Sequence, residues 1–285
     1  MRKIDDEIQA LLSEHRGDIR SILKDNHRLD LLYALSSQRE LLLEWYDFEP
    51  EAEVLQVGAD YGALTGLLRS SVRAVTVLDD TESALETVRQ RYPGAANIYY
   101  RKDSLAGYAA EACAEGKKYD YVIFAGTLTA PYEKHIHAAK SLLKPEGILI
   151  VASANALGMK YFAGTVEEEN ALTKRQLTEL LCGDRETQSM ADESGALKFY
   201  YPMPDYKTPV SIYSDAYLPK KGDLTRVTPA YDYPPYHLME QGEKFDTVCE
   251  AGLFDLYANS YLVFWSADPK QLQKEDERIF MKYNK

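Results

Sequence analysis

The spacing of apolar residues changes near residue 50. Before it, apolar positions over Ile4–Leu23 recur every three or four residues, which predicts an amphipathic helix. A second helix is expected over about Leu29–Tyr46, ending before Pro50. We expect this N-terminal helical segment, residues 1–48, to pack against the rest of the chain. A cap over a binding site and an interaction arm are the alternatives.

From Glu51 onward, short apolar runs alternate with amphipathic stretches. Five strands are expected at Glu53–Val57, Ala74–Leu78, Asn97–Tyr100, Tyr119–Phe124 and Ile148–Ala152. Strands separated by helices predict right-handed βαβ units and a parallel sheet. Two further strands are expected later in the chain, at Leu197–Tyr201 and Asn259–Trp265.

The segment between these late strands has an unusual composition, since residues 202–235 hold seven of the twelve prolines. Proline restricts the backbone, so we expect an ordered, irregular insertion or substrate lobe over 202–257. It would lie within a main domain spanning 49–268, followed by a tail, 269–285. The segment is also rich in tyrosine, at positions 200, 201, 206, 213, 217, 231, 233 and 236. These side chains either contact a sugar or pack the lobe.

Charge and composition exclude several classes of protein. Lys and Arg number 33 against 45 Asp and Glu, a net charge of −12, which disfavours nucleic acid as a partner. No apolar run reaches membrane-spanning length, and the acidic N-terminus lacks the apolar core of a signal peptide. The three widely spaced cysteines indicate a reducing compartment. We therefore expect a cytoplasmic protein without membrane insertion.

A glycine loop gives the strongest indication of a binding site. Gly58, Gly62 and Gly66 follow the first strand, and Asp79 ends the second strand. Such a loop lets a ligand approach the backbone, and a carboxylate at the neighbouring strand end can accept ribose hydroxyls. The spacing differs from the G-x-G-x-x-G of dinucleotide-binding proteins. A purely structural strand–helix turn is the alternative.

These residues resemble a known family. Residues 51–153 are similar to the core of class I S-adenosylmethionine-dependent methyltransferases, through the glycine loop, Asp79 and the Lys144-Pro-Glu-Gly147 turn. The resemblance implies a Rossmann-like seven-stranded α/β sheet, mostly parallel, whose last strand is antiparallel. The C-terminal part resembles a bacterial subgroup associated with cell-surface polysaccharide synthesis, through Asn155–Gly164, Phe199–Lys207 and Ala258–Leu262.

The resemblance also implies roles for individual residues. Those expected to bind the cofactor S-adenosyl-L-methionine are Gln56, Gly58, Ala59, Asp60, Tyr61, Gly62, Asp79, Asp80, Asp103, Ala125 and Gly126, with Thr127 beside them. Two of them depart from the family pattern: Gln56 replaces an acidic residue and Asp60 replaces a glycine. Gln56 can still orient the N–H groups of the loop. The Asp60 carboxylate either pairs with the ammonium group of the cofactor or repels its carboxylate.

Residues that contact the substrate or carry the chemistry are harder to identify. Asn155, Lys160 and Tyr161 follow the fifth strand at the ligand edge and are candidates for substrate contact. The candidate bases are His237, Asp205 and Tyr206, and each has a structural alternative. His135 and His137 lie two residues apart on an expected helix, on different faces, so we expect no metal site there.

Three functions are compatible with these features. The first is a methyltransferase whose substrate is a small molecule or glycan, namely a sugar or a cell-surface glycan precursor. A homodimer is compatible with this function. The second is a non-catalytic binding or scaffolding module with a degenerate cofactor loop. The third, a nucleotide-dependent oxidoreductase or epimerase, is disfavoured by the missing phosphate-binding fingerprint.

Overall fold

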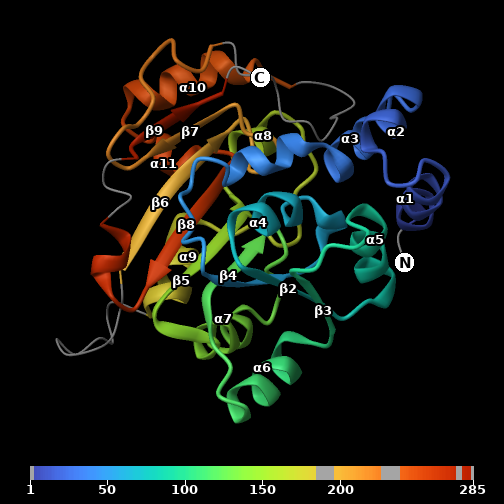
Figure 1. Ribbon diagram of the computed structural model, residues 1–285. Coiled ribbons are helices and arrows are strands. Elements are labelled where there is room, and N and C mark those ends of the chain that lie inside the picture. The colour runs from blue at the N-terminus through green and yellow to red at the C-terminus, as the bar shows by residue number, and fades with distance from the viewer. Residues whose placement is uncertain (1–2, 184–195, 226–237, 274–277, 284–285) are drawn as a thin grey trace.

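A nine-stranded mixed sheet forms the centre of the computed structural model, which describes residues 3–183, 196–225, 238–273 and 278–283 (Figure 1). Within these residues the strand order is β3-β2-β1-β4-β5-β8-β6-β7-β9. The strands are β1 Glu53–Val57, β2 Ala74–Asp79, β3 Ile98–Lys102, β4 Tyr119–Ala125, β5 Leu143–Ala154, β6 Ala196–Met203, β7 Ser211–Ser214, β8 Ser260–Ser266 and β9 Phe280–Lys282.

The sheet has a parallel half and an antiparallel half. Strands β3, β2, β1, β4 and β5 are mutually parallel, whereas β8, β6, β7 and β9 each pair antiparallel with their neighbours. This order confirms the predicted α/β, Rossmann-like sheet of the methyltransferase type. The described sheet has two strands more than the seven expected, because β7 and β9 extend its antiparallel edge. Both are short and have no alternating pattern long enough to predict.

The helices that the structure describes are α1 Lys3–Glu14, α2 Ile19–Asp25, α3 Leu29–Leu35, α4 Thr65–Ser71, α5 Glu82–Arg91, α6 Leu105–Ala114, α7 Tyr132–Ser141, α8 Met159–Phe162, α9 Lys174–Cys182, α10 Gln241–Glu250 and α11 Phe254–Tyr257. Helix α8 was not predicted, and α10 and α11 lie in the insertion that the sequence predicted to be irregular. The described residues also form the short 3₁₀ helices η1 Ser37–Leu42, η2 Asp60–Gly62 and η3 Pro269–Leu272. Among these described residues, no helix combines the length and the apolar character that crossing a membrane requires.

The two long N-terminal helices predicted from the sequence are broken in the structure. Arg16 and Gly17 have φ values of 53° and 77°, a left-handed turn that ends α1, and Asp18 then caps α2. The second expected helix becomes α3 and η1, because Ser36 ends one and caps the other through its hydroxyl. Periodicity alone missed these breaks, since the apolar spacing continues across them.

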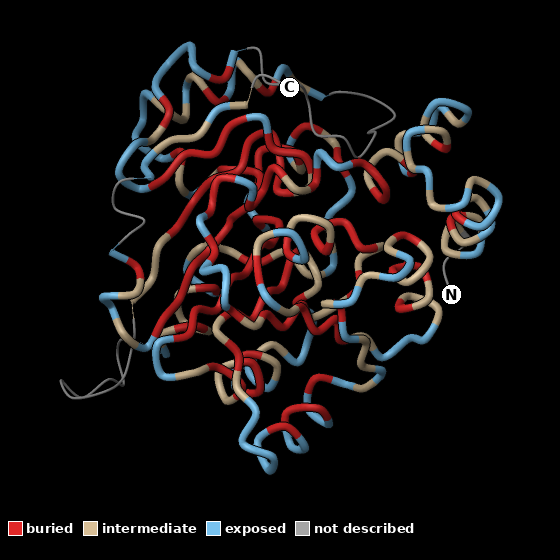
Figure 2. Tube along the Cα trace, in the orientation of Figure 1, coloured by how far each residue is buried: buried red, intermediate tan, exposed pale blue. Residues whose placement is uncertain are grey.

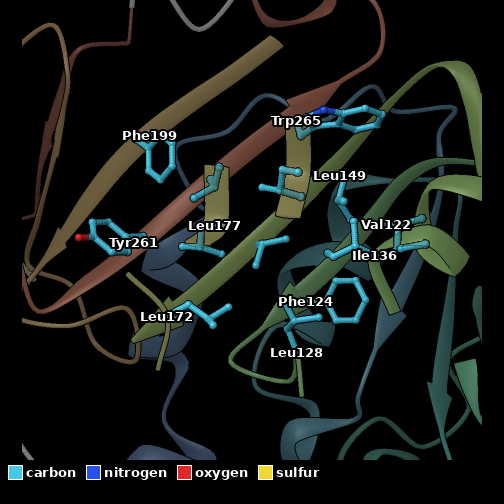
Figure 3. Packing of buried hydrophobic residues seen from close by; sticks show 14 of the residues in the cluster. Val122, Phe124, Leu128, Ile136, Leu149, Leu172, Leu177, Phe199, Tyr261 and Trp265 are labelled. Atoms are coloured by element: carbon cyan, nitrogen blue, oxygen red, sulfur yellow. The ribbon is translucent and has the colours of Figure 1, made fainter. Parts of the chain in front are cut away.

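Alternation along the strands divides the core between the two faces of the sheet. In β5, Ile148 and Ile150 point to one face, whereas Leu149 and Val151 point to the other. The second of these faces packs against α6, α7 and α9 (Figure 3). The first packs against α4, α5 and an aromatic segment that includes Trp45. Figure 2 shows the sheet as the continuous buried centre of the molecule.

The structure assigns several tyrosines of the proline-rich region to packing. Tyr200, Tyr201, Tyr206 and Tyr213 are each at most 4% exposed and belong to the two main cores. Tyr217 remains 40% exposed. The tyrosines at 231, 233 and 236 lie outside the described residues.

Candidate functional site

The glycine loop after β1 adopts a tight left-handed conformation. Gly58, Asp60, Tyr61 and Gly62 all have positive φ, and Asp60 and Tyr61 are uncommon in this region because they carry a Cβ. Asp79, at the end of β2, supports the loop. Its Oδ2 accepts the N–H of Ala59 at 2.9 Å, and its Oδ1 accepts the N–H of Thr81 at 2.9 Å. The carboxylate therefore joins the two strand ends.

Gln56 fixes the loop from below through its amide. Its Nε2 donates to the carbonyl oxygens of Gly58 at 3.1 Å and Ala59 at 3.3 Å, while its Oε1 accepts the Thr65 hydroxyl at 2.8 Å. The side chain thus orients carbonyl groups rather than the N–H groups expected from the sequence. A glutamate here would point carboxylate oxygens at two carbonyl oxygens, so the loop requires the amide.

The N-terminal helical segment contacts the two left-handed residues of this loop that are not glycine, Asp60 and Tyr61. Arg39 of η1, whose side chain is 7% exposed, forms an ion pair with the Asp60 carboxylate. The Tyr61 hydroxyl donates to Asp5 Oδ1 of α1 at 2.6 Å, and Arg91 Nη1 donates to the Tyr61 carbonyl at 2.9 Å. Asp60 is therefore neutralised by a residue of this chain, an outcome that the sequence did not predict.

The three loop glycines serve different contacts. A Cβ on Gly62 would lie 3.1 Å from the Tyr92 ring, and one on Gly66 would lie 2.7 Å from the Tyr92 hydroxyl, so both allow α5 to approach. A Cβ on Gly58 would lie 2.5 Å from Cγ2 of Thr127, whose hydroxyl donates to the Val57 carbonyl. Close packing within the protein thus accounts for all three.

A pocket of about 820 Å³ opens at the carboxyl ends of β1, β2, β3 and β4. The predicted cofactor residues that line it are Gly58, Asp60, Tyr61, Asp79, Asp80, Asp103 and Gly126. Those buried behind its wall are Gln56, Ala59, Gly62 and Ala125. The pocket lies where open α/β sheets bind ligands, and its volume is that of an ordinary small-molecule site.

The pocket is strongly acidic. Five aspartates line it, at positions 5, 60, 79, 80 and 103, and its described lining contains neither lysine nor arginine. Carboxylates that share a concave wall sum their fields, so a cation is attracted into the pocket and an anion is repelled.

Sequence reasoning missed several residues of the pocket wall. Asp5 reaches it from α1, Ser83 and Thr87 from α5, and Thr129 and His135 from the β4–α7 connection and α7. His135 Nδ1 lies 2.8 Å from the Thr129 carbonyl and therefore donates to it. No local motif marks these residues, because tertiary packing alone brings them to the pocket.

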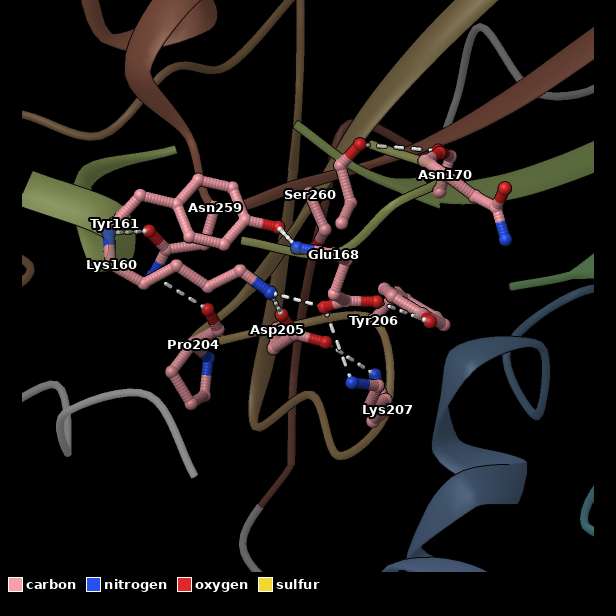
Figure 4. A network of polar contacts seen from close by, with 12 residues as sticks. Lys160, Tyr161, Glu168, Asn170, Pro204, Asp205, Tyr206, Lys207, Asn259 and Ser260 are labelled. Atoms are coloured by element: carbon pink, nitrogen blue, oxygen red, sulfur yellow. Dashed lines mark hydrogen bonds and ion pairs between the residues drawn. The ribbon is translucent and has the colours of Figure 1, made fainter. Parts of the chain in front are cut away.

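A buried network of charges lies beyond the pocket, at the ends of β5, β6 and β8 (Figure 4). Lys160, which is 0% exposed, donates to Glu168 at 2.7 Å and to Asp205 at 2.8 Å. Lys207 also pairs with Glu168, at 3.2 Å. Tyr206 connects the two regions: its hydroxyl is 3.4 Å from Glu168, and a Cβ on Gly126 would lie 2.4 Å from the same hydroxyl.

The network sets the protonation of its members. Burial alone would raise the pKa of Asp205, but Lys160 and Lys207 outweigh it and hold that pKa below its usual value. Burial, reinforced by Glu168 and Asp205, raises the pKa of Tyr206 well above its ordinary value. At neutral pH Asp205 is thus a paired carboxylate and Tyr206 a hydrogen-bond donor. Neither geometry favours a general base, and His237 lies outside the described residues.

The predicted substrate contacts have differing environments. Asn155 is fully buried, and its amide donates to the carbonyls of Leu256 and Ala258 at 2.7 Å each. Tyr161 is partly exposed beside the network, where its hydroxyl accepts the Glu168 N–H at 3.3 Å, and its pKa is raised by burial to about 12. Lys160 is enclosed by its ion pairs. Substrate contact by these residues stays a prediction.

No family model and no curated protein matches the chain. Solved structures of methyltransferases are similar at low identity. An N-methyltransferase NodS from Bradyrhizobium japonicum, in complex with S-adenosyl-L-homocysteine, is 20% identical, with a TM-score of 0.37 over 52% of this chain and 72% of that one. A phosphoethanolamine N-methyltransferase from Haemonchus contortus is 16% identical, with a TM-score of 0.46 over 71% of this chain and 45% of that one. These similarities concern the fold and do not identify a substrate.

Proposed function

We propose that the chain is an S-adenosylmethionine-dependent methyltransferase whose cofactor binds in the acidic pocket at the ends of β1 to β4. The charge of this pocket is the observation that carries the proposal. S-adenosylmethionine has a sulfonium and an ammonium group against a single carboxylate, so it is a net cation. A wall of aspartates with no lysine or arginine in its described lining favours such a ligand.

Individual residues fit parts of this cofactor. Asp79 uses two of its roughly four lone-pair sites on backbone N–H groups, which leaves acceptors for ribose hydroxyls. Asp103, which follows β3, would accept from the adenine amine, and Gly126 would lie near the transferred methyl group. When bound, the cofactor supplies a methyl group activated on sulfur. The chain's own contribution is to hold that group in line with an acceptor.

The same charge argues against the oxidoreductase alternative. Nicotinamide dinucleotides bring a pyrophosphate, which proteins usually place on a free helix N-terminus or beside a cation. Here the pocket presents five aspartates, and the nearby guanidinium of Arg39 is already paired with Asp60. A dianionic pyrophosphate would therefore be repelled.

The acceptor stays a prediction. The sequence suggests a sugar or glycan precursor, and no contact among the described residues identifies one. Because Asp205 is paired and Tyr206 keeps its proton, neither residue is suited to be the base that a hydroxyl acceptor needs.

A non-catalytic binding module is the second candidate. The observation in its favour is that Thr127 packs against Gly58, so contacts within the protein account for this glycine without a ligand. Single-turnover transfer of a labelled methyl group to any acceptor would exclude this candidate.

Calorimetric titration tests the proposal. We expect S-adenosylmethionine and S-adenosylhomocysteine to bind the wild type and raise its unfolding temperature, and NAD⁺ to do neither. Asp79→Asn should weaken both ligands at least tenfold, since it removes one ribose acceptor and loosens the loop. Absence of heat and of a thermal shift at millimolar S-adenosylmethionine, with a natively folded protein, would refute the proposal.

A further inference from the structure

Helix α1 has one well-defined position against the pocket. Its buried residues Ile8 and Leu12 belong to a small core shared with Ile22, Leu31 and Leu35, separate from the two main cores. Its polar face is fixed on α5, because Gln9 Nε2 donates to the Ser83 carbonyl at 2.6 Å, to the Ser83 hydroxyl at 2.9 Å and to Thr87 Oγ1 at 3.2 Å. Figure 1 shows α1 beside α5, at the end of the sheet that carries β2 and β3.

This docking brings Asp5 to the pocket. Asp5 and Gln9 are four residues apart, hence on one face of α1, so the contacts of Gln9 with α5 direct Asp5 towards the same side. Asp5 lines the pocket together with Ser83 and Thr87, and its Oδ1 accepts the Tyr61 hydroxyl at 2.6 Å. The neighbouring Asp6 is exposed and is absent from the pocket wall.

We propose that Asp5 is a specificity-determining residue of the pocket, and that the N-terminal helix thereby selects a positively charged ligand. The assignment rests on the proposed function and adds a residue to it. S-adenosylmethionine and its product differ by the methyl group and by the charge on sulfur. A carboxylate on the wall attracts the sulfonium form more strongly than the neutral thioether, whether or not it touches the sulfur. Asp5 therefore favours binding of the methyl donor and release of the product.

The adjacent aspartates provide a matched pair of variants. Asp5→Asn and Asp6→Asn remove the same charge from the first turn of the same helix, so they change the net charge and the helix-dipole interaction equally. Dissociation constants for S-adenosylmethionine and S-adenosylhomocysteine are measured for both variants and the wild type. We expect Asp5→Asn to weaken S-adenosylmethionine about threefold to tenfold and S-adenosylhomocysteine by less than about twofold. Asp6→Asn should leave both constants close to those of the wild type.

A third variant separates charge from positioning. Tyr61→Phe removes the hydroxyl that donates to Asp5 but keeps the carboxylate, so we expect the preference for the sulfonium form to persist. Equal weakening of both ligands by Asp5→Asn would overturn the assignment, because it would indicate a role in shaping the loop. Equal effects of Asp5→Asn and Asp6→Asn would overturn it as well. If the wild type binds neither S-adenosylmethionine nor S-adenosylhomocysteine, the proposed function itself is refuted.

Discussion

Two groups of charged side chains lie at the same edge of the sheet, and they are balanced differently. The pocket at the ends of β1 to β4 gathers five aspartates, of which Asp60 is paired with Arg39. The network at the ends of β5, β6 and β8 combines two lysines with two carboxylates, in an interior where Lys160 is fully buried. The first group has an excess of negative charge beside an open pocket. In the second group, the positive and negative side chains pair with one another.

This difference indicates that the pocket binds a ligand, whereas the buried network stabilises the structure around it. A buried charge persists only when it is paired and hydrogen-bonded, as Lys160 is, so the network fixes the geometry of the loops around it. A concave wall with excess charge is stabilised by a ligand of opposite sign. Tyr206 touches both regions, through Glu168 on one side and Gly126 on the other, so a rigid network also holds one wall of the pocket.

Breaking the network should have the largest effect on stability. Lys160→Met removes the closest cation from two carboxylates and leaves Asp205, which is 3% exposed, with Lys207 as its remaining cationic neighbour. We expect a loss of about 3–5 kcal/mol in the free energy of unfolding, measured by denaturant titration at pH 7. Lys144→Met is the control, since Lys144 is 42% exposed and pairs with Asp120 alone. A similar loss in the free energy of unfolding for both variants would mean that the buried network contributes no more to stability than an exposed ion pair.

The pH dependence of the same variant gives an independent test. In the wild type the pKa of Asp205 is depressed, so its stabilising contribution is complete above about pH 4 and is lost as pH falls further. Without Lys160, Lys207 alone of the two lysines opposes the effect of burial, so the pKa of Asp205 rises. The variant then gains stability relative to the wild type as pH falls from 7 towards 5. A gap between the two proteins that stays constant over this range would contradict the assignment.

Much of the fold could be predicted from the sequence. The parallel strands have dense apolar runs separated by recognisable helices, so a parallel α/β sheet followed from general rules of connection, while its Rossmann-like form was implied by the family resemblance. The breaks in the N-terminal helices were missed because apolar spacing alone was followed, whereas Gly17, Asp18 and Ser36 are residues that end or cap helices. Strands β7 and β9 were missed because pairing creates them, of β7 with β6 and of β9 with β7, and not their own pattern.

The site was predictable in part, for a related reason. Gly58, Asp79 and Asp103 follow consecutive strands, so their place at the carboxyl edge is a consequence of topology. Asp5 and Arg39 reach the loop through tertiary packing of the N-terminal segment, which no local pattern encodes. The family resemblance implied an acidic residue at position 56, so Gln56 was interpreted as a departure from the pattern. In the structure its amide donates to two carbonyl oxygens of the loop.

Replacing the Gln56 amide with a carboxylate tests the difference between the acidic pocket and the buried network. Gln56→Glu places a buried carboxylate against the carbonyls of Gly58 and Ala59, below a pocket that is already acidic. We expect a loss of about 1–3 kcal/mol in stability, together with weaker binding of S-adenosylmethionine. Gln56→Met, which loses the hydrogen bonds without adding a charge, isolates the electrostatic part. A glutamate variant as stable as the wild type would show that the loop rearranges to accept it.

The smallest predicted effect concerns the ion pair that joins the N-terminal segment to the loop. Arg39→Met leaves the Asp60 carboxylate without its counter-ion in an acidic pocket, and we expect a loss of about 1–2 kcal/mol because Asp60 is 23% exposed and partly hydrated. Asp60→Gly removes the charge and the cost of a left-handed aspartate together, so it should be milder.

The double variant decides whether Arg39 acts through Asp60. If it does, Arg39→Met costs clearly less in the Asp60→Gly background than in the wild type, because no carboxylate remains to be stranded, and the two changes are non-additive. Arg28→Met is the matched control, since Arg28 pairs with Glu7 and Asp30 in an exposed position and its loss should change little. Additive losses in the free energy of unfolding would contradict this prediction, because they would show that Arg39 stabilises the protein independently of Asp60.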